Sequence, residues 1–211
     1  MLKKLFTTTL LTLSLCAPTL AELPQPLPGK DAPAINEIVH VVFETDQGPL
    51  DIEVYPEAAP NAAKRFLELV EMGFYDNTPI FRVVSKPEPF VAQFGINSEF
   101  KEWENNSFKD DPTYYQLTRG TLAFAKAGPD TNSTQVFINY RDNNRLAAPE
   151  LNFTTFGQVV EGMDNADKFV SVGDERMGLD QDELWANTRL VDNLEQKPTM
   201  ITSARIVKDE E

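Results

Sequence analysis

The chain has 211 residues, of which 41% are hydrophobic and 25% are charged. This composition is typical of a globular protein and argues against a disordered, fibrous or membrane-embedded one. The formal net charge of -14 repels phosphate backbones and anionic lipid headgroups, so neither nucleic acid nor a membrane surface is expected as a partner.

The first 21 residues have the pattern of a signal peptide. Two lysines precede an apolar run over residues 5–15, and residues 19–21 supply a cleavage site. The run is too short to cross a hydrocarbon core, which needs about 20 helical residues. We therefore expect residues 1–21 to be removed and the protein to be secreted across the inner membrane, with the periplasm as its destination. An uncleaved anchor and a lipid on Cys16 are the alternatives.

A proline-rich stretch follows the predicted signal peptide. Residues 24–33 contain four prolines and Gly29, with little apolar content. Such a composition stays extended and does not pack. We expect residues 22–34 to form a disordered linker and residues 35–211 to form one domain.

The domain begins with a predicted β-hairpin. Residues 38–43 are mostly β-branched, and Leu50, Ile52 and Val54 alternate with polar residues, as in strands with one buried face. The sequence Gln-Gly-Pro at residues 47–49 supplies the turn between them.

An amphipathic helix is predicted next. Its apolar residues recur at i, i+3, i+4 and i+7 opposite charged ones, and they are Ala63, Phe66, Leu67 and Val70. Gly73 follows as a stop signal.

The remaining elements are short. Strands are predicted at residues 80–84, 90–94, 121–125, 135–139, 156–160 and 200–207. A second helix is predicted over residues 165–170. Many short strands with two helices are typical of a closed antiparallel barrel capped at its ends. Residues 171–199 are polar and receive no assignment.

Side chains for nucleophilic or metal chemistry are scarce. The one histidine, His40, lies inside an apolar strand pattern, and the one cysteine would leave with the signal peptide. No metal site built on these residue types, no disulfide and no cofactor are expected. Acidic pairs such as Asp110 with Asp111 arise by chance among 33 acidic residues, which disfavours a hydrolase.

Arg82 stands out because it lies within the apolar run Phe-Arg-Val-Val at residues 81–84. By spacing alone it is a charge on the solvent face of a strand. A functional role is the alternative, and the resemblance described next favours it.

Four sequence blocks together resemble the cyclophilin family. They are Gly-Phe-Tyr-Asp-Asn-Thr at 73–78 leading into Phe-Arg-Val-Val, Phe-Val-Ala-Gln-Phe-Gly at 90–95, the segment 120–139, and Phe-Thr-Thr-Phe-Gly-Gln-Val-Val-Glu-Gly-Met at 153–163. The resemblance covers about residues 39–170 and extends to the closing strand near residues 201–207. It implies a mainly β fold, a closed eight-stranded antiparallel barrel capped by two α-helices.

The resemblance also implies a groove on the outer wall of the barrel that binds proline-containing peptides. Arg82 matches the catalytic arginine of the family, Gln93 matches a glutamine beside it, and Phe90 matches a wall of the proline pocket. The other residues that match substrate-binding positions are Val91, Ala125, Lys126, Ala127, Gln135, Phe137, Leu146 and Phe153.

Val91 takes the place of a usual methionine, and the sequence departs from the family pattern at five further places. Phe94 replaces a glycine, Lys126 replaces an asparagine, and Phe153 stands where many members have histidine. Residues 85–89 form a longer turn than usual, and Arg145 is near the position of a tryptophan that favours cyclosporin. These departures bear on catalytic efficiency and on the position of Phe90.

The resemblance implies a peptidyl-prolyl cis-trans isomerase that works as a monomer, without metal or cofactor, on proline-containing polypeptides and assists the folding of exported proteins. One alternative is a chaperone or interaction module that holds proline peptides with little turnover. Hydrolysis by an acidic pair is the other. Each matched residue also fits an ordinary core or strand position, so the interpretation depends on their joint occurrence in family order.

Overall fold

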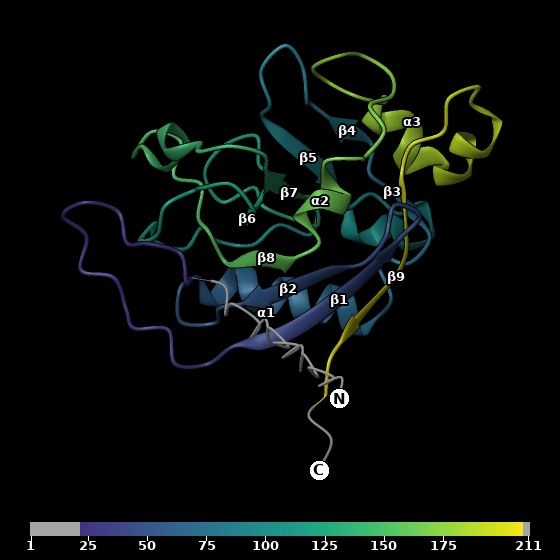
Figure 1. The fold of residues 1–211 in the computed structure, drawn as a ribbon. Helices are drawn as coiled ribbons and strands as arrows, with labels where there is room; N and C mark the ends of the chain where they lie inside the picture. Colours follow the sequence, from purple (N-terminus) through teal and green to yellow (C-terminus); the bar gives the residue numbers. More distant parts are fainter. Residues whose placement is uncertain (1–21, 209–211) are drawn as a thin grey trace, which may run out of the picture.

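Nine strands form one antiparallel sheet in the computed structural model, which describes residues 22–208 (Figure 1). The predicted signal peptide lies outside the described residues. The order across the sheet is β3-β9-β1-β2-β8-β6-β7-β5-β4. The strands are β1 (Val39–Thr45), β2 (Leu50–Val54), β3 (Thr78–Pro79), β4 (Arg82–Val83), β5 (Val91–Phe94), β6 (Thr121–Phe124), β7 (Val136–Asn139), β8 (Gly157–Glu161) and β9 (Met200–Ile206).

The predicted hairpin is confirmed as β1 and β2. Val41 lies opposite Ile52, and Phe43 lies opposite Leu50. These four side chains are buried, whereas the residues between them are partly exposed, because successive side chains of a strand point to opposite faces. Gly48 has a φ of 116°, which the tight turn requires and which favours glycine.

The expected closed eight-stranded barrel is wrong, because the sheet is a curled half-barrel of nine strands. The strand predicted at residues 80–84 is divided: β3 pairs with β9, and β4 pairs with β5. Ile80 and Phe81 lie between them, and their backbone groups bond to Thr199 and Leu179 instead. Within residues 22–208 no ladder joins β3 to β4, so the two edges of the sheet are connected by the chain alone.

The first predicted helix is confirmed as α1 (Pro60–Glu71), which lies behind β1 and β2 in Figure 1. Its apolar face packs into the curled sheet. The ring of Phe66 lies 5.8 Å from that of Phe43 and 5.0 Å from that of Phe156, measured between centroids. The main core therefore sits between α1 and the concave side of the sheet.

The second predicted helix, over residues 165–170, is wrong. The structure has only α2 (Met163–Ala166) there, because the Val170 N–H donates to the Thr199 hydroxyl instead of to a helical carbonyl. The unassigned segment contains α3 (Gln181–Ala186), and three 3₁₀ helices complete the fold: η1 (Ser98–Trp103), η2 (Asn144–Ala147) and η3 (Thr188–Asn193). None of the helices formed by residues 22–208 is long and apolar enough to cross a membrane.

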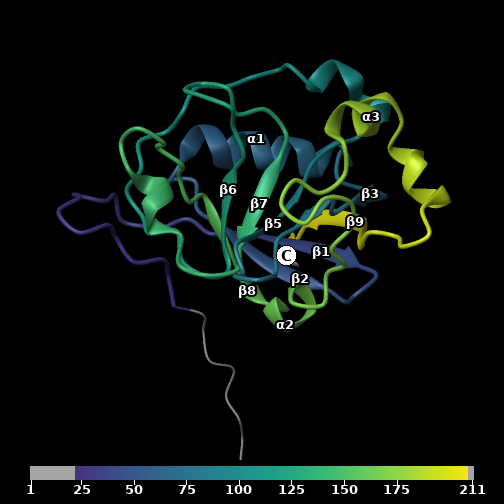
Figure 2. The same ribbon diagram turned by 90° about the horizontal axis from the view of Figure 1, so that it is seen from above.

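Residues 22–34 differ from the disordered linker that composition predicts. Figure 2 shows this purple segment running along one side of the molecule, opposite the yellow segment around η3. The Leu27 N–H donates to the Tyr114 carbonyl at 2.8 Å, and the Gln116 N–H donates to the Gln25 carbonyl at 2.9 Å. The Tyr115 hydroxyl donates to the Pro33 carbonyl. The segment has little apolar surface of its own to bury, but its backbone N–H and C=O groups pair with residues 114–116, and these hydrogen bonds hold it against the domain.

A distant carboxylate caps the N-terminus of α1. Ala59, at the N-cap position, has no side chain that can accept a hydrogen bond. Asp111 accepts instead, from the backbone N–H of Asn61 at 3.1 Å and from that of Ala62 at 2.9 Å. The carboxylate thereby satisfies two of the four N–H groups that a helix leaves unpaired at its start.

We expect Asp111→Ala to lower the free energy of unfolding by about 1–2 kcal/mol, because two buried N–H groups lose their acceptor. Asp111→Asn, which keeps one acceptor oxygen, should lose less. Denaturant unfolding measures both, with the exposed Asp31→Ala as the control for removing one negative charge. Equal stability of Asp111→Ala and Asp31→Ala would contradict the capping role.

Candidate active site

The pairing register of β4, β5 and β7 brings the residues of the candidate site side by side. Arg82 on β4 lies opposite Gln93 on β5, and Gln93 lies opposite Phe137 on β7. Directly paired residues share one face of a sheet. Their chain neighbours Ala92 and Ile138 belong to the main core, so this row of side chains lies on the outer, convex face.

A chain of hydrogen bonds runs along this row. Arg82 Nη1 donates to Gln93 Oε1 at 2.9 Å, and Gln93 Nε2 donates to Gln135 Oε1 at 2.7 Å. Gln135 Nε2 then donates to Gln181 Oε1 at 3.0 Å. Because each amide is bonded on both sides, its orientation is fixed, and Gln93 presents its oxygen to the guanidinium of Arg82.

The predicted apolar site residues gather in a second cluster, separate from the main core. Val91, Phe137 and Leu146 are buried in it, and Phe90, Ala125 and Phe153 pack against it from partly exposed positions. The rings of Phe137 and Phe153 lie 5.7 Å apart at an interplanar angle of 68°. Their edge-to-face contact is a favourable aromatic geometry. The cluster forms a partly open apolar wall beside Arg82.

A pocket of about 400 Å³ adjoins this cluster. Its lining contains the remaining predicted residues, and its members are Gln93, Ala125, Lys126, Ala127, Thr131, Ser133, Gln135, Met177 and Gln181. The structure thus brings all the predicted site residues to one region of the outer face, although they come from segments as distant as β4 and η2.

The ammonium group of Lys126, a predicted substrate-binding residue, is engaged inside the protein. Its side chain is 4% exposed, and Nζ donates to Asp110 Oδ2 at 2.6 Å and to the Asn152 carbonyl at 3.0 Å. The ammonium also lies 5.4 Å from the centre of the Phe153 ring. Lys126 therefore contributes to the lining of the pocket, while its ammonium group is held by Asp110 and Asn152 and stabilises the wall.

The other departures leave the groove intact. Phe94 is 1% exposed and points into the main core, where its ring lies 5.5 Å from that of Tyr75. The long turn at residues 85–89 is closed at its base, because the Phe90 N–H donates to the Val84 carbonyl at 2.8 Å. Phe90 consequently remains at the apolar cluster despite the longer turn.

The unassigned segment supplies parts of the site that the sequence did not reveal. The Arg176 carbonyl accepts a hydrogen bond from Arg82 Nε at 2.5 Å. Gly178 lies so close to β4 that a Cβ atom there would be 2.2 Å from the Phe81 carbonyl oxygen. Met177 and Gln181 line the pocket. The glycine was the only sequence signal for this close approach, since the segment has no periodic pattern.

Arg82 is partly withdrawn from water, and this desolvation lowers the pKa of its guanidinium. An arginine remains protonated at neutral pH even so. A cation with less water around it interacts more strongly with a new acceptor. Two of its five N–H groups are used by Gln93 and Arg176, which leaves three that face no acceptor within residues 22–208.

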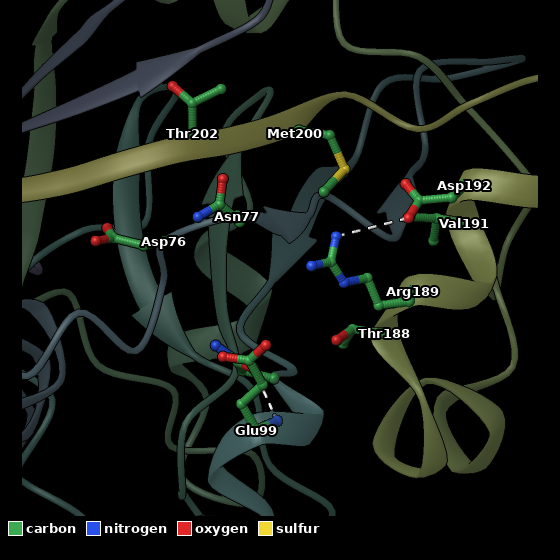
Figure 3. Close-up of a pocket in the computed structure, with 10 residues that line it drawn as sticks. Asp76, Asn77, Glu99, Thr188, Arg189, Val191, Asp192, Met200 and Thr202 are labelled. Atoms are coloured by element: carbon green, nitrogen blue, oxygen red, sulfur yellow. Dashed lines mark hydrogen bonds and ion pairs between the residues drawn. The ribbon is translucent and has the colours of Figure 1, made fainter.

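A further pocket of about 410 Å³ lies between β9, η1 and η3 (Figure 3). It contains none of the predicted site residues. Arg189 and Asp192 form an ion pair at 3.8 Å across one wall, and the Asp76 carboxylate accepts the Ala204 N–H. Across residues 22–208, no three acidic, histidine or cysteine side chains gather so as to hold a metal ion.

Comparison with known families agrees with this geometry. Residues 40–192 match the family model described as cyclophilin type peptidyl-prolyl cis-trans isomerase/CLD. The chain belongs to this family, and its activity is peptidyl-prolyl cis-trans isomerisation.

Bacterial relatives carry the same activity in their names. The peptidyl-prolyl cis-trans isomerase of Acinetobacter baylyi is 33% identical over 171 residues, or 79% of this chain and 84% of the relative. Peptidyl-prolyl cis-trans isomerase B of Escherichia coli is 34% identical over 155 residues, or 67% of this chain and 90% of the relative.

Solved structures agree in fold. A cyclophilin type isomerase of Cryptosporidium parvum matches with a TM-score of 0.62 at 22% identity, covering 82% of this chain and all of that one. The same protein has been solved in the presence of the dipeptide Ala-Pro, and that structure matches with a TM-score of 0.61.

We expect Lys126→Ala to lower the free energy of unfolding by about 3 kcal/mol, because the largely enclosed Asp110 carboxylate loses its cation and keeps only the Asn132 amide as a side-chain partner. The kcat/KM of the surviving folded protein on an X-Pro peptide should change less than about threefold. The exposed Lys64→Ala, on α1, is the matched control for stability. A tenfold loss of kcat/KM at unchanged stability would instead show that Lys126 binds substrate.

Proposed function

We propose that the groove binds proline-containing segments of exported polypeptides and that Arg82 lowers the barrier to rotation about their X-Pro bonds. The observation that carries this proposal is the position of a fixed guanidinium, with three unused N–H groups, beside a partly open apolar cluster. The cluster offers a surface for a proline ring, and the guanidinium offers donors at its edge.

The reaction needs no covalent chemistry. The barrier of about 18–20 kcal/mol arises because amide resonance is lost when the X-Pro bond is half rotated. The proline nitrogen then regains its lone pair and becomes a hydrogen-bond acceptor. A group that donates to this nitrogen binds the twisted amide better than either planar isomer, which is the condition for catalysis.

Arg82 meets the geometric needs of such a donor. Gln93 Oε1 and the Arg176 carbonyl hold the guanidinium in one orientation before substrate arrives. Its central carbon lies 5.9 Å from the centre of the Phe90 ring, at the border of the apolar cluster. A donor that is already oriented pays little reorganisation when the lone pair forms.

The apolar cluster has a separate role. Phe90, Val91, Phe137 and Leu146 hold the proline ring, so that rotation takes place in the chain on the other side of the bond. Phe153 supports the face of Phe137. Immobilising one side of the bond in an apolar site also excludes the water that stabilises the planar, more polar amide.

The magnitudes are compatible with this division of roles. A thousandfold acceleration requires about 4 kcal/mol of transition-state stabilisation. One hydrogen bond to a charged group contributes about 1.5–3 kcal/mol. Arg82 supplies much of the requirement, and the shape of the groove supplies the rest.

We expect Arg82→Ala to lower kcat/KM by about ten- to a hundredfold, which corresponds to 1.5–3 kcal/mol of transition-state binding. Arg82→Lys should also be poor, since an ammonium cannot donate to Gln93, Arg176 and substrate from one rigid plane. Protease-free exchange NMR on an X-Pro peptide measures the rates, and thermal unfolding reports the fold. The control is Arg205→Ala, a surface arginine on β9. A folded Arg82→Ala protein with unchanged kcat/KM contradicts the mechanism.

The proposed location is the periplasm, on the basis of the lysines and the apolar run at residues 1–15. Its clients would then be exported proteins, and the isomerase would assist their folding. We expect the mature protein to begin at Glu22. Mass spectrometry of the protein recovered from a periplasmic fraction tests this. An intact Met1, or a lipid on Cys16, would contradict it.

A further inference from the structure

A third pocket, of about 560 Å³, lies beside Arg82 and does not share its lining with the pocket around Gln93 and Gln135. We call it the basic pocket, and it is lined by Arg82, Val84, Lys86, Pro87, Glu88, Phe90, Arg141, Arg145 and Arg176. Its lining comes from the 85–89 turn, η2 and the segment before α3. Arg82 and Phe90 belong both to this pocket and to the proposed isomerase site, so the two are continuous.

The charge of the basic pocket is opposite to that of the protein. Five of its lining side chains are cationic, whereas the chain carries a net charge of -14. Its one carboxylate, Glu88, is paired with Arg141 at 2.7 Å. The carboxylate of Asp174, next to this wall, accepts the backbone N–H groups of Arg176 and Met177 at 2.8 Å each. Glu88 therefore already has a cationic partner, while Asp174 accepts two backbone N–H groups and also attracts Arg176 electrostatically.

Among residues 22–208, the arginines without a carboxylate within 4.0 Å are concentrated here. The chain has eight arginines, all within residues 22–208, and five of them have a carboxylate within 4.0 Å: Arg65, Arg119, Arg141, Arg189 and Arg205. The other three are Arg82, Arg145 and Arg176, and all three line the basic pocket. In a protein with 33 acidic residues, unpaired arginines at one pocket mark a place that fits an external anion.

One of these arginines is also held close to the isomerase site. The guanidinium carbon of Arg145 lies 5.3 Å from the centre of the Phe90 ring. Stacking on an aromatic ring restrains an arginine while its N–H groups stay free to bind a carboxylate with two parallel hydrogen bonds. An anion bound there would lie next to the bound proline.

We propose that the basic pocket binds an aspartate or glutamate side chain of the client polypeptide, located within a few residues of the proline that is isomerised. This inference rests on the proposed function of the groove. It makes the enzyme selective for X-Pro bonds in acidic sequence, using carboxylates that an unmodified client carries. Charge complementarity of this kind gives specificity more than raw affinity.

Two electrostatic effects on a client have opposite signs, which makes the inference testable. The net charge of the whole protein attracts a basic peptide and repels an acidic one over distances of about 10 Å at 0.1 M salt. The basic pocket acts only at contact and favours the acidic peptide. A preference for acid therefore cannot come from the overall charge.

The experiment uses exchange NMR on X-Pro peptides that carry glutamate, glutamine or lysine at one of the three positions on either side of proline. At low salt we expect glutamate at one or more positions to raise kcat/KM about tenfold over lysine, and 0.5 M NaCl to reduce this ratio to about twofold. Lys86→Glu should lower the ratio at least threefold, because it should reduce kcat/KM on the glutamate peptide more than on the glutamine or lysine peptide. Arg145→Gln should lower the ratio as well.

The matched control is Lys64→Glu, which makes the same charge change at an exposed position on α1. If Lys64→Glu and Lys86→Glu change the ratio equally, or if lysine peptides are turned over as fast as glutamate peptides, the inference is overturned. A response to phosphoserine peptides with none to glutamate also overturns it, in favour of a phosphate site. No turnover of any peptide would instead contradict the proposed function.

Discussion

The hydrogen bond between Arg82 and Gln93 is the interaction on which the rest of the site depends. It exists because β4 and β5 pair in a register that places these two residues opposite each other on the outer face. The Arg176 carbonyl completes the arrangement from a segment that is 94 residues further along the chain. Since a cation held by two acceptors needs little reorganisation to donate to a third, the fold supplies an oriented donor at the edge of the apolar cluster.

The alternation of side chains along β5 places its residues in two different apolar clusters, the main core and the cluster at the groove. Ala92 and Phe94 face the main core, which holds the sheet to α1, while Val91 and Gln93 face the groove. A phenylalanine at position 94 is therefore a core residue and does not enter the groove. The same alternation explains how the chain departs from its family at this position while the groove keeps its apolar wall and its polar row.

The cationic side chains differ in whether they have a carboxylate partner. Five of the eight arginines and the buried Lys126 have a carboxylate partner, and Lys126 with Asp110 is the most enclosed of these pairs. Arg82, Arg145 and Arg176, which line the basic pocket with Phe90, are different, because none of them has a carboxylate within 4.0 Å among residues 22–208. On a protein with a net charge of -14, the cationic lining of the basic pocket is the feature that favours the binding of a client carboxylate next to the isomerase site.

The sequence by itself determined the local elements and the identity of the family. Alternation predicted β1 and β2, helical periodicity predicted α1, and four ordered blocks identified the candidate residues from Arg82 to Phe153, because these signals depend only on neighbours in the chain. The tertiary structure decided what depends on distant partners. It divided the strand at residues 80–84 between β9 and β5, and it placed the proline-rich segment along residues 114–116. It turned Lys126 toward Asp110 and brought Arg176 to Arg82. None of these contacts has a periodic signal, since each is fixed by packing between segments that lie far apart in the sequence.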